Sequence, residues 1–351
     1  MRKFLIAVNP GDGVGQEVTR AAMRVLDRVA ELEYQVFDWG AEYYLHHGRM
    51  MPEDALDLLK KTDAILLGAI GHPDIPDHIT LNGLLLPIRR GFDQYANVRP
   101  AILYPGVASP LANPGPINMV VVRENTEGEY AQVGGFLYHH QPDEVAIQTG
   151  VFTRRGVERV VRHAFQLAQR RNGKRRVTSI TKSNAQGFGM VLWDRAFAAV
   201  AAEFPDIETE SLLVDAAAMN FVRRPASFDV VVGSNLFGDI LSDLSAILTG
   251  SIGLAPSANL DPARRYPSMF EPVHGSAPDI AGRGIVNPLA AILSAGMMLE
   301  HLGIEAAGRA VERAVAAVLA EKRVRTPDLA GTSSTREVTD AVLEQLRASG
   351  K

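Results

Sequence analysis

The sequence predicts an α/β fold with a large, mostly parallel β-sheet, and three observations support this prediction. Apolar runs of strand length alternate with amphipathic segments of helical period along the first hundred residues. One run, "DAILLGAI" at residues 63–70, is apolar on both faces, which is typical of a strand covered by helices on either side. The chain has 351 residues, which suits two domains better than one hydrophobic core.

The elements are expected in the following order. Strands are predicted at residues 3–8, 34–39, 63–70, 118–125, 144–152, 174–184 and 228–235. Helices are predicted from residue 13 to about residue 32, at 53–61, before the "NVRP" segment at 97–100, between the later strands, and from residue 288 onward. The last helix opens with a capping box formed by Ser334 and Glu337. We expect residues 1–99 and 249–351 to form one domain, and residues 100–248 to form a second domain inserted into it.

Composition excludes several classes of site. There are no cysteines, so disulfides, thiolate metal sites and cysteine nucleophiles are excluded. The net charge of −4 gives no reason to expect a polyanionic partner. Residues 153–177 are rich in arginine, but an apolar stripe from Val157 to Ala168 predicts a helix with its arginines on the solvated face. No stretch has the pattern of a signal peptide or a membrane span, so we expect a cytoplasmic enzyme that binds neither nucleic acid nor membrane.

The glycine-rich turn "NPGDGVGQEV" at residues 9–18 is similar to a dinucleotide-binding fingerprint but does not match it. Gly11 and Gly13 fit the first two glycine positions, whereas Gln16 stands at the third. Asp38 is a poor match for the acidic residue expected about 20 residues further on. We therefore interpret this segment as a strand–turn–helix junction with Asp12 near the helix N-terminus, and expect the cofactor to bind elsewhere.

Two aspartates four residues apart are a candidate metal site. Asp239 and Asp243 share one face of a predicted helix over residues 234–248, whose buried stripe would contain Leu236, Phe237, Ile240, Leu241, Leu244, Ile247 and Leu248. Two like charges at this spacing destabilise a helix by a few tenths of a kcal/mol unless a cation lies between them. Either both are simply solvated, or they bind a divalent metal, for which oxygen ligands favour Mg²⁺ or Mn²⁺ over Zn²⁺.

Basic residues could bind the carboxylates of an acidic substrate. Arg89, Arg99 and Arg123 are suited to bidentate binding of carboxylates, although any one of them is equally well explained by a structural salt bridge. Lys182 is a candidate base, because a lysine near a cation and away from water has a lowered pKa. Tyr130 is a candidate proton donor.

Taken together, these segments resemble one family, the metal-dependent, pyridine-nucleotide-linked β-decarboxylating dehydrogenases, which include isocitrate, isopropylmalate and tartrate/D-malate dehydrogenases. The resemblance covers nearly the whole chain and rests on "NVRP", "VVRENTEGEY", "TKSN", "SNLFGDILSDL", "GLAPSANL" and "FEPVHGSAPDIAGRGIVNP". The opening turn also resembles the family's, where a proline usually stands at Gln16. The resemblance implies an isocitrate/isopropylmalate dehydrogenase-like fold: a large twisted mixed sheet with helices on both faces, two domains, and not the usual Rossmann arrangement.

The resemblance also implies roles for particular residues. Three arginines would bind the substrate carboxylates: Arg89, Arg99 and Arg123. Three aspartates would hold Mg²⁺ or Mn²⁺: Asp239 and Asp243 of one subunit and Asp215 of its neighbour. Lys182, also from the neighbour, would be the base at the hydroxyl, and Tyr130 the acid. A homodimer with shared active sites is therefore implied, with a clasp arm at residues 131–150 of the inserted substrate and dimerisation domain.

The same resemblance places NAD on the segment at residues 274–288 of the larger, cofactor-binding domain. The lining residues would be His274, Gly275, Ser276, Ala277 and Asn287. Asp279 would accept hydrogen bonds from the ribose hydroxyls and repel a 2′-phosphate, and relatives that use NADP tend to carry Lys then Tyr at Asp279 and Ile280. NAD is thus the expected cofactor, with K⁺ as a further candidate activator.

The substrate is expected to be a malate-type 2-hydroxy acid, because several segments look most like tartrate and D-malate dehydrogenases. In those relatives tryptophan often stands at Asn82, within a segment that should face the substrate's third carbon. A small Asn82 leaves room or adds a hydrogen bond there, so isopropylmalate, isocitrate and homoisocitrate stay open as substrates. Oxidation without loss of CO₂ and a non-catalytic dicarboxylate-binding protein are further alternatives. His139 and His140 are not expected to form a metal pair, because neighbours in a strand point to opposite sides.

Overall fold

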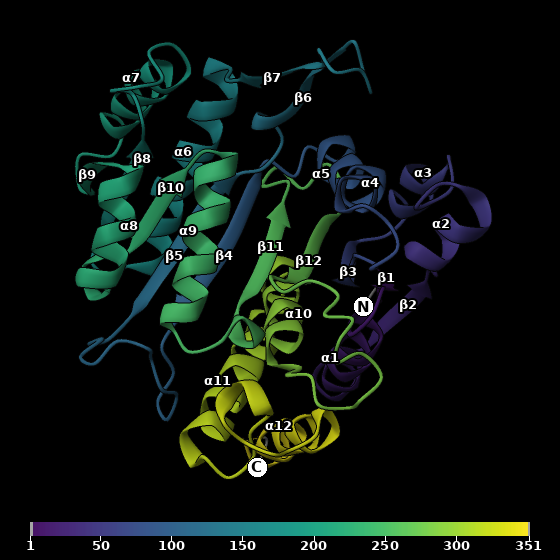
Figure 1. Ribbon diagram of the computed structural model, residues 1–351. Coiled ribbons are helices and arrows are strands. Elements are labelled where there is room, and N and C mark those ends of the chain that lie inside the picture. Colours follow the sequence, from purple (N-terminus) through teal and green to yellow (C-terminus); the bar gives the residue numbers. More distant parts are fainter. Residues whose placement is uncertain (1–2, 350–351) are drawn as a thin grey trace.

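A ten-stranded mixed β-sheet runs through the computed structural model, which describes residues 3–349 (Figure 1). The strands lie in the order β2-β1-β3-β12-β11-β4-β5-β10-β8-β9. Their bounds are β1 (Phe4–Gly11), β2 (Leu32–Val36), β3 (Ala64–Ala69), β4 (Ala96–Ile102), β5 (Asn118–Glu124), β8 (Arg176–Thr181), β9 (Glu208–Leu213), β10 (Val230–Gly233), β11 (Pro256–Leu260) and β12 (Ser268–Pro272). A separate hairpin consists of β6 (Gly128–Leu137) and β7 (Val145–Val151).

Helices cover both faces of the sheet. They are α1 (Gly15–Val29), α2 (Ala41–His47), α3 (Ala55–Leu59), α4 (Asp77–Thr80), α5 (Leu86–Gly91), α6 (Arg154–Arg171), α7 (Gly189–Ala201), α8 (Val214–Arg223), α9 (Asn235–Leu248), α10 (Leu289–His301), α11 (Glu305–Glu321) and α12 (Thr335–Ser349). A π-helical turn at Leu81–Leu85 joins α4 to α5, and short 3₁₀ turns lie at Pro225–Ser227, Ile252–Leu254 and Pro327–Leu329. Among residues 3–349, no helix is long and apolar enough to cross a membrane.

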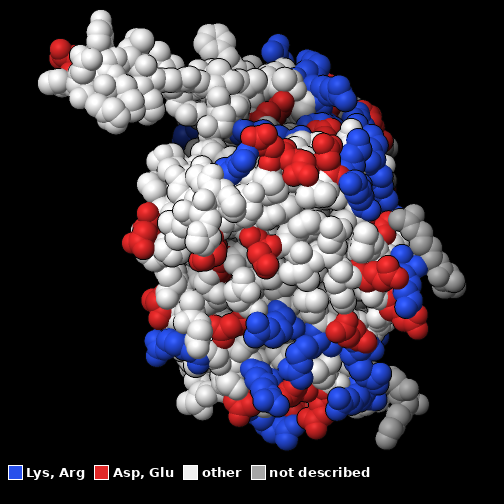
Figure 2. Space-filling view, turned by 90° about the vertical axis from the view of Figure 1, so that its right-hand side faces the viewer, with Lys and Arg blue, Asp and Glu red and all other residues white. Residues whose placement is uncertain are grey.

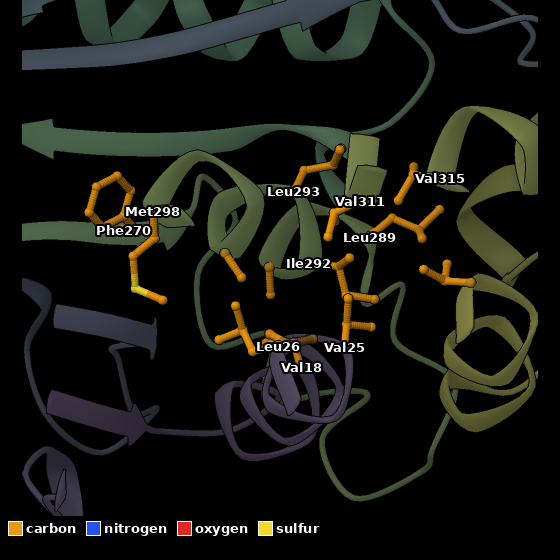
Figure 3. Packing of buried hydrophobic residues seen from close by; sticks show 14 of the residues in the cluster. Val18, Val25, Leu26, Phe270, Leu289, Ile292, Leu293, Met298, Val311 and Val315 are labelled. Carbon is orange, nitrogen blue, oxygen red and sulfur yellow. The ribbon is translucent and has the colours of Figure 1, made fainter. Parts of the chain in front are cut away.

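In the half of the sheet that contains β1, strands β1 and β3 are covered on both faces. Ile6 and Ala7, neighbours on β1, point into different hydrophobic clusters because successive strand residues face opposite ways. Figure 3 shows the first cluster, in which Val25 and Leu26 of α1 face Ile292 of α10. β3 is buried at every position, so the prediction for residues 63–70 is confirmed.

The other half of the sheet has its own core, whose buried members lie between Val98 and Leu248. β5, β10, β8 and β9 pair in parallel there. Helix α6 packs on one face and α9 on the other (Figure 1). The sheet is continuous across the proposed boundaries near residues 99 and 249, and the division into two domains stays a prediction.

The centre of the sheet departs from the mostly parallel arrangement that the strand–helix alternation predicts. β4 is antiparallel to both β5 and β11, and β11 is antiparallel to β12. This mixed sheet agrees with the fold that the family resemblance implies. Strands β4, β11 and β12 were missed because buried polar residues and prolines interrupt their apolar pattern; Asn97, Pro256 and Asn259 are examples.

Two helices test the predicted apolar stripes. In α6 the stripe from Val157 to Ala168 is buried as predicted, and outward-facing arginines pair with acidic groups, as Arg162 does with Glu203. In α9 the prediction is wrong at Ile240 and Ile247, which are 57% and 50% exposed. The buried face of α9 combines Phe237, Leu241 and Leu248 with small residues such as Gly238 and Ala246, and Ile240 and Ile247 lie on the opposite face. The predicted capping box of α12 is confirmed, since Ser334 and Glu337 each accept a hydrogen bond from the other's backbone N–H.

The hairpin of β6 and β7 projects from the body of the molecule and contains most of residues 131–150, whose role as a clasp stays a prediction. It is the largely uncharged arm at the top of Figure 2. Its exposed apolar residues are Val133, Phe136, Leu137, Tyr138, Val145 and Ile147. On α8, which packs against α9, Met219 and Val222 are exposed as well. Exposed apolar side chains grouped on one element, as on this hairpin, are typical of a protein–protein interface.

Acidification is expected to destabilise the fold through His163 of α6 and His301 of α10. Burial lowers the pKa of each to about 4 from 6.5. The unfolded chain therefore binds more protons, and stability is fully present above pH 6.5 and lost as the pH falls toward 4. For His163 the expected loss at pH 5 is about 2 kcal/mol.

Urea unfolding at pH 7, 6 and 5 measures this effect. His163→Gln should flatten the pH dependence, whereas His46→Gln, an exposed control, should keep the wild-type slope. Equal slopes in all three proteins would contradict the assignment.

Candidate active site

Charged side chains gather where β4, β5 and α9 meet. Arg99 lies on β4 and Arg123 on the neighbouring β5, and only 7% and 2% of their surfaces are exposed. Asp239 and Asp243 lie one turn apart on α9, which packs against β5. A buried guanidinium is stable only when its charge is paired, and these aspartates supply the partners.

Asp239 is the centre of this cluster. Its Oδ1 accepts hydrogen bonds from Arg99 Nη1, at 3.1 Å, and from Arg123. Its Oδ2 accepts one from the hydroxyl of Tyr130 on β6, at 3.1 Å. Arg99 Nη1 also reaches Asp243 Oδ1 at 3.3 Å. The structure thus brings together five of the predicted site residues: Arg99, Arg123, Tyr130, Asp239 and Asp243.

The first turn of α9 is fixed against β5 and β6. Ser234 caps the helix and donates to Glu129 Oε1 at 2.7 Å. Asn235 Oδ1 accepts from Nε and Nη2 of Arg123 at 2.9 and 2.6 Å. Gly238 lies against Arg123, since a Cβ at this position would be 2.6 Å from Arg123 Cβ. The missing side chain therefore lets α9 come close enough for Asp239 to pair.

Burial and charge set the protonation of this cluster. Burial alone would raise the pKa of Asp239, but Arg123, Arg99 and Arg89 outweigh it and hold the pKa below its usual value. Burial raises the pKa of Asp243, and the charge on Asp239 raises it further. Burial, together with Asp239, also raises the pKa of Tyr130, which keeps its proton at neutral pH. Burial lowers the pKa of Arg123 to about 10, so this guanidinium remains charged.

Arg89, the third predicted arginine, lies beside the same site. With Arg99 it lines a cleft of about 130 Å³, whose other side includes His274 and Gly275. Arg89 Nη2 donates to Glu271 Oε1 at 2.7 Å. The Nε atoms of Arg89 and Arg99 are buried and have no hydrogen-bond partner within residues 3–349. Since an unpaired buried N–H costs about 1–3 kcal/mol, both favour an acidic ligand in the cleft.

Asn82 is not among the residues that line this cleft. Its Nδ2 donates to the carbonyl of His78 at 2.6 Å, so the amide turns back along its own helix. Leu81 and Leu85 line the cleft instead. The π-helical turn that contains all three residues changes the side-chain directions expected for an α-helix.

Lys182 and Asp215 lie apart from the arginine–aspartate cluster. They directly follow β8 and begin α8, and Lys182 Nζ donates to Asp215 Oδ1 at 2.7 Å. This hydrogen bond lowers the pKa of Asp215. β10 lies between β8 and β5, which separates Lys182 from the strand of Arg123 by about 10 Å. Within the described part of one chain, the pair makes no polar contact with Asp239.

The predicted cofactor segment follows β12 and packs on the opening turn. Val14 N donates to Ser276 O at 2.9 Å, and a Cβ on Gly13 would lie 2.1 Å from that oxygen. Gly13 is therefore needed for close packing under this segment. Asp12 lies just before α1, as expected, and its carbonyl accepts from Gly15 N at 2.9 Å, whereas its carboxylate accepts from Ala41 N of α2 at 2.7 Å.

The other predicted cofactor residues differ in whether their polar groups are free to contact a ligand. Burial lowers the pKa of His274, and its buried Nε2 has no partner within the described chain, which fits a ligand contact. Gly275 has open space where a side chain would stand. Ala277 has φ of 37° and Asp279 is exposed. Asn287 donates to Asp328 at 2.9 Å and accepts from Leu289 N at 3.0 Å, so both ends of its amide hold the fold.

The hairpin carries a second group of metal-binding residue types. His139, His140 and Glu144 have ligand atoms within 4.8 Å of one another. The expectation that the two histidines point to opposite sides is wrong, because they lie in the turn after β6, and their ring centroids are 3.7 Å apart. All three side chains are exposed, and a 2.6 Å hydrogen bond from His139 to Glu144 accounts for their closeness. We assign no metal to them.

Comparison with known proteins identifies the family. A family model described as isocitrate/isopropylmalate dehydrogenase matches residues 5–342. This chain belongs to the isocitrate/isopropylmalate dehydrogenase family. A probable tartrate dehydrogenase/decarboxylase of Agrobacterium vitis is 51% identical over 99% of this chain and 98% of that protein. The D-malate dehydrogenase [decarboxylating] of Escherichia coli (strain K12) is 49% identical over 97% of this chain and 98% of that protein.

A solved structure supports the same assignment. The crystal structure of isocitrate dehydrogenase from Methylococcus capsulatus matches with a TM-score of 0.90 at 37% identity, and covers 98% of this chain and 99% of that one. The predicted family, its fold and the prediction of a decarboxylating dehydrogenase are therefore confirmed.

Sequence reasoning missed several residues that shape the site of this family member. Ser242 accepts from Arg99 at 2.7 Å, Asn235 orients Arg123, and Glu271 pairs with Arg89. Their spacing carries little signal, because each lies in an apolar or turn segment remote from its partner. Asn235 and Ser242 do lie on the same helix as Asp239, so their position on that helix could have identified them from the sequence.

Gly238→Ala should reduce both stability and activity. The added Cβ would press on Arg123, so we expect a loss of about 1–3 kcal/mol in unfolding free energy. Displacement of Asp239 should lower kcat/KM as well. Thermal unfolding and steady-state kinetics measure the two effects. Gly187→Ala, where a Cβ has open space, is the control, and equal behaviour of the two variants would contradict the packing argument.

Proposed function

We propose that this protein catalyses the NAD- and divalent-metal-dependent oxidation and decarboxylation of a malate-type 2-hydroxy acid, D-malate or tartrate. The observation that carries the proposal is the cluster of Arg99, Arg123, Tyr130, Asp239 and Asp243 beside a cleft. The names of the relatives at 49–51% identity support the substrate class.

The arginines are proposed to bind the substrate's carboxylates. Arg89 and Arg99 line the cleft with an unpaired buried Nε each, and Arg123 lies behind them with its charge retained. Guanidinium groups match carboxylates through paired N–H donors. A ligand with two carboxylates would satisfy these donors and offset the crowding of three cations around Asp239.

Asp239 and Asp243 fit a divalent cation, with Asp215 of a partner subunit as the proposed third ligand. All of the ligand atoms that these aspartates offer are oxygens, which suits a hard divalent cation. The negative charge of Asp239 contributes to the raised pKa of Asp243, and a bound cation would offset the repulsion between the two carboxylates. When bound, Mg²⁺ or Mn²⁺ acidifies the substrate hydroxyl and stabilises the negative charge that develops after CO₂ leaves. His274 Nε2, Gly275, Ser276 and Ala277 are the residues proposed to hold NAD, which would supply the hydride acceptor.

Two residues are proposed to move protons. Lys182, in its neutral amine form, accepts the proton of the substrate hydroxyl, and its 2.7 Å hydrogen bond to Asp215 Oδ1 holds Nζ in place. Tyr130 gives its proton to the substrate carbon after decarboxylation, and its raised pKa means that the hydroxyl still carries this proton at neutral pH. Asp279, exposed on the cofactor segment, would repel a 2′-phosphate, which supports NAD over NADP.

A homodimer is proposed as the active unit. In one chain Lys182 and Asp215 are remote from Asp239, yet Asp215 is on α8, beside the exposed apolar residues of α8 and α9. A two-fold axis across this surface would bring the pair from one subunit to the aspartates of the other, in both directions. The exposed apolar hairpin would extend the same interface.

A substrate panel tests the proposed reaction. With NAD⁺ and Mn²⁺, we expect D-malate or a tartrate isomer to have the highest kcat/KM among these compounds, isopropylmalate and isocitrate. Isopropylmalate is the second candidate, because Leu81 and Leu85 form an apolar wall beside Arg89. CO₂ measured against NADH separates decarboxylation from oxidation alone. Full activity in excess EDTA would contradict the metal.

Mixing two inactive variants tests the shared site. Lys182→Met and Tyr130→Phe should each lower kcat by about 100-fold or more, with little change in NAD binding. When they are unfolded and refolded together, half of the dimers pair the two variants, and one of the two sites in each is intact. Activity should return to about a quarter of wild type. No recovery would contradict a site built from two subunits.

A further inference from the structure

A chain of buried amides connects the middle of the sheet to Arg89. Asn97 on β4, Asn125 after β5 and Asn259 on β11 are each at most 1% exposed. Nδ2 of Asn97 and Nδ2 of Asn125 both donate to Asn259 Oδ1, at 3.0 and 2.9 Å. At the other end of the same amide, Asn259 Nδ2 donates to Glu271 Oε1 at 2.8 Å.

The two donors fix the orientation of the Asn259 amide. If it flipped, its NH₂ group would face two other NH₂ groups, and its oxygen would face a carboxylate. The flipped state would replace these three hydrogen bonds with contacts between like groups at a buried position, so it is strongly disfavoured. Asn259 must therefore present N–H donors to β12.

Glu271 connects the fixed amide of Asn259 to Arg89 in the cleft. Its Oε1 accepts from both Asn259 Nδ2 and Arg89 Nη2, at 2.8 and 2.7 Å. Because Nη2 is held there, the planar guanidinium of Arg89 has fewer directions open to its remaining N–H groups. Glu271 and Arg89 both line the cleft. A flexible arginine on a short helix is thus restricted before any ligand binds.

We infer that Asn259, acting through Glu271, is a positioning residue that sets the affinity of Arg89 for a substrate carboxylate. The inference rests on the proposed function, because it takes Arg89 to be a ligand of the acid. Asn259 touches no reacting group; it acts by restricting a side chain that does. Preorganisation of this kind strengthens binding because less freedom is lost when the ligand arrives.

A double-mutant cycle tests the inference with D-malate as the probe. Its Kd is measured by calorimetry with Mn²⁺ present, for wild type, Asn259→Ser, Arg89→Lys and the double variant. Asn259→Ser should raise Kd about tenfold, and the double variant should bind no more weakly than Arg89→Lys alone. Coupling of this size is expected only when one residue acts through the other. The KM for D-malate should rise similarly, with kcat changed less than about twofold.

Two further variants separate positioning from general stability. Ser294→Ala removes a buried hydroxyl that contacts the backbone of Ser257 and Glu271 but not the Glu271 carboxylate; it should lower Tm and leave Kd unchanged. Glu271→Gln keeps the shape of the side chain that contacts Arg89 but removes its charge. It should also raise Kd, and the Kd of the double variant with Arg89→Lys should be no higher than that of Arg89→Lys alone. Glu271→Gln replaces Asn259→Ser if the latter does not fold.

The outcomes are distinguishable. If Arg89→Lys leaves Kd unchanged, the carboxylate role of Arg89 in the proposed function is wrong, and the inference fails with it. If Arg89→Lys weakens binding but the second substitution adds its full effect, the proposed function stands and the positioning role of Asn259 is overturned.

Discussion

The structure depends on pairing the buried guanidinium of Arg123. An arginine with 2% of its surface exposed is stable in a sheet only if an acid reaches it, and Asp239 does so from α9. That requirement brings α9 against β5, selects Gly238 at the contact, and leaves Ile240 and Ile247 on the outer face of the helix. One buried charge thus explains both the site and the exposed apolar surface beside it.

The mixed sheet decides which polar groups meet. Because β4 and β11 run antiparallel to their neighbours, residues remote in sequence face each other across the sheet: Asn97 lies opposite Asn259, and also opposite Arg123 on its other side. Asn97 and Asn259 lie on the strands that break the parallel order, and Asn125 directly follows β5. Hydrogen bonds from Asn97 and Asn125 to Asn259, and from Asn259 to Glu271, link the geometry of the central strands to that of the cleft.

The separation of Lys182 and Asp215 from the cluster follows from the same strand order. β10 stands between β5 and β8, and the pair turns toward α8. A single chain therefore carries two partial groups of catalytic residue types. The exposed surfaces of α8, α9 and the hairpin lie on the side where a second chain could bring such groups together.

The sequence by itself determined the α/β class, the buried strand at residues 63–70, the stripe of α6 and the capping box of α12, because periodicity and local capping depend on neighbours in the chain. It also selected Arg99, Arg123, Tyr130, Asp239 and Asp243, through residue types and family resemblance. Only the tertiary structure decided that strands β4, β11 and β12 exist, because their buried polar residues find partners far away in the chain. It likewise decided that Asn82 turns from the cleft and that Glu271 and Asn259 stand behind Arg89, since contacts across a sheet leave no periodic trace in the sequence.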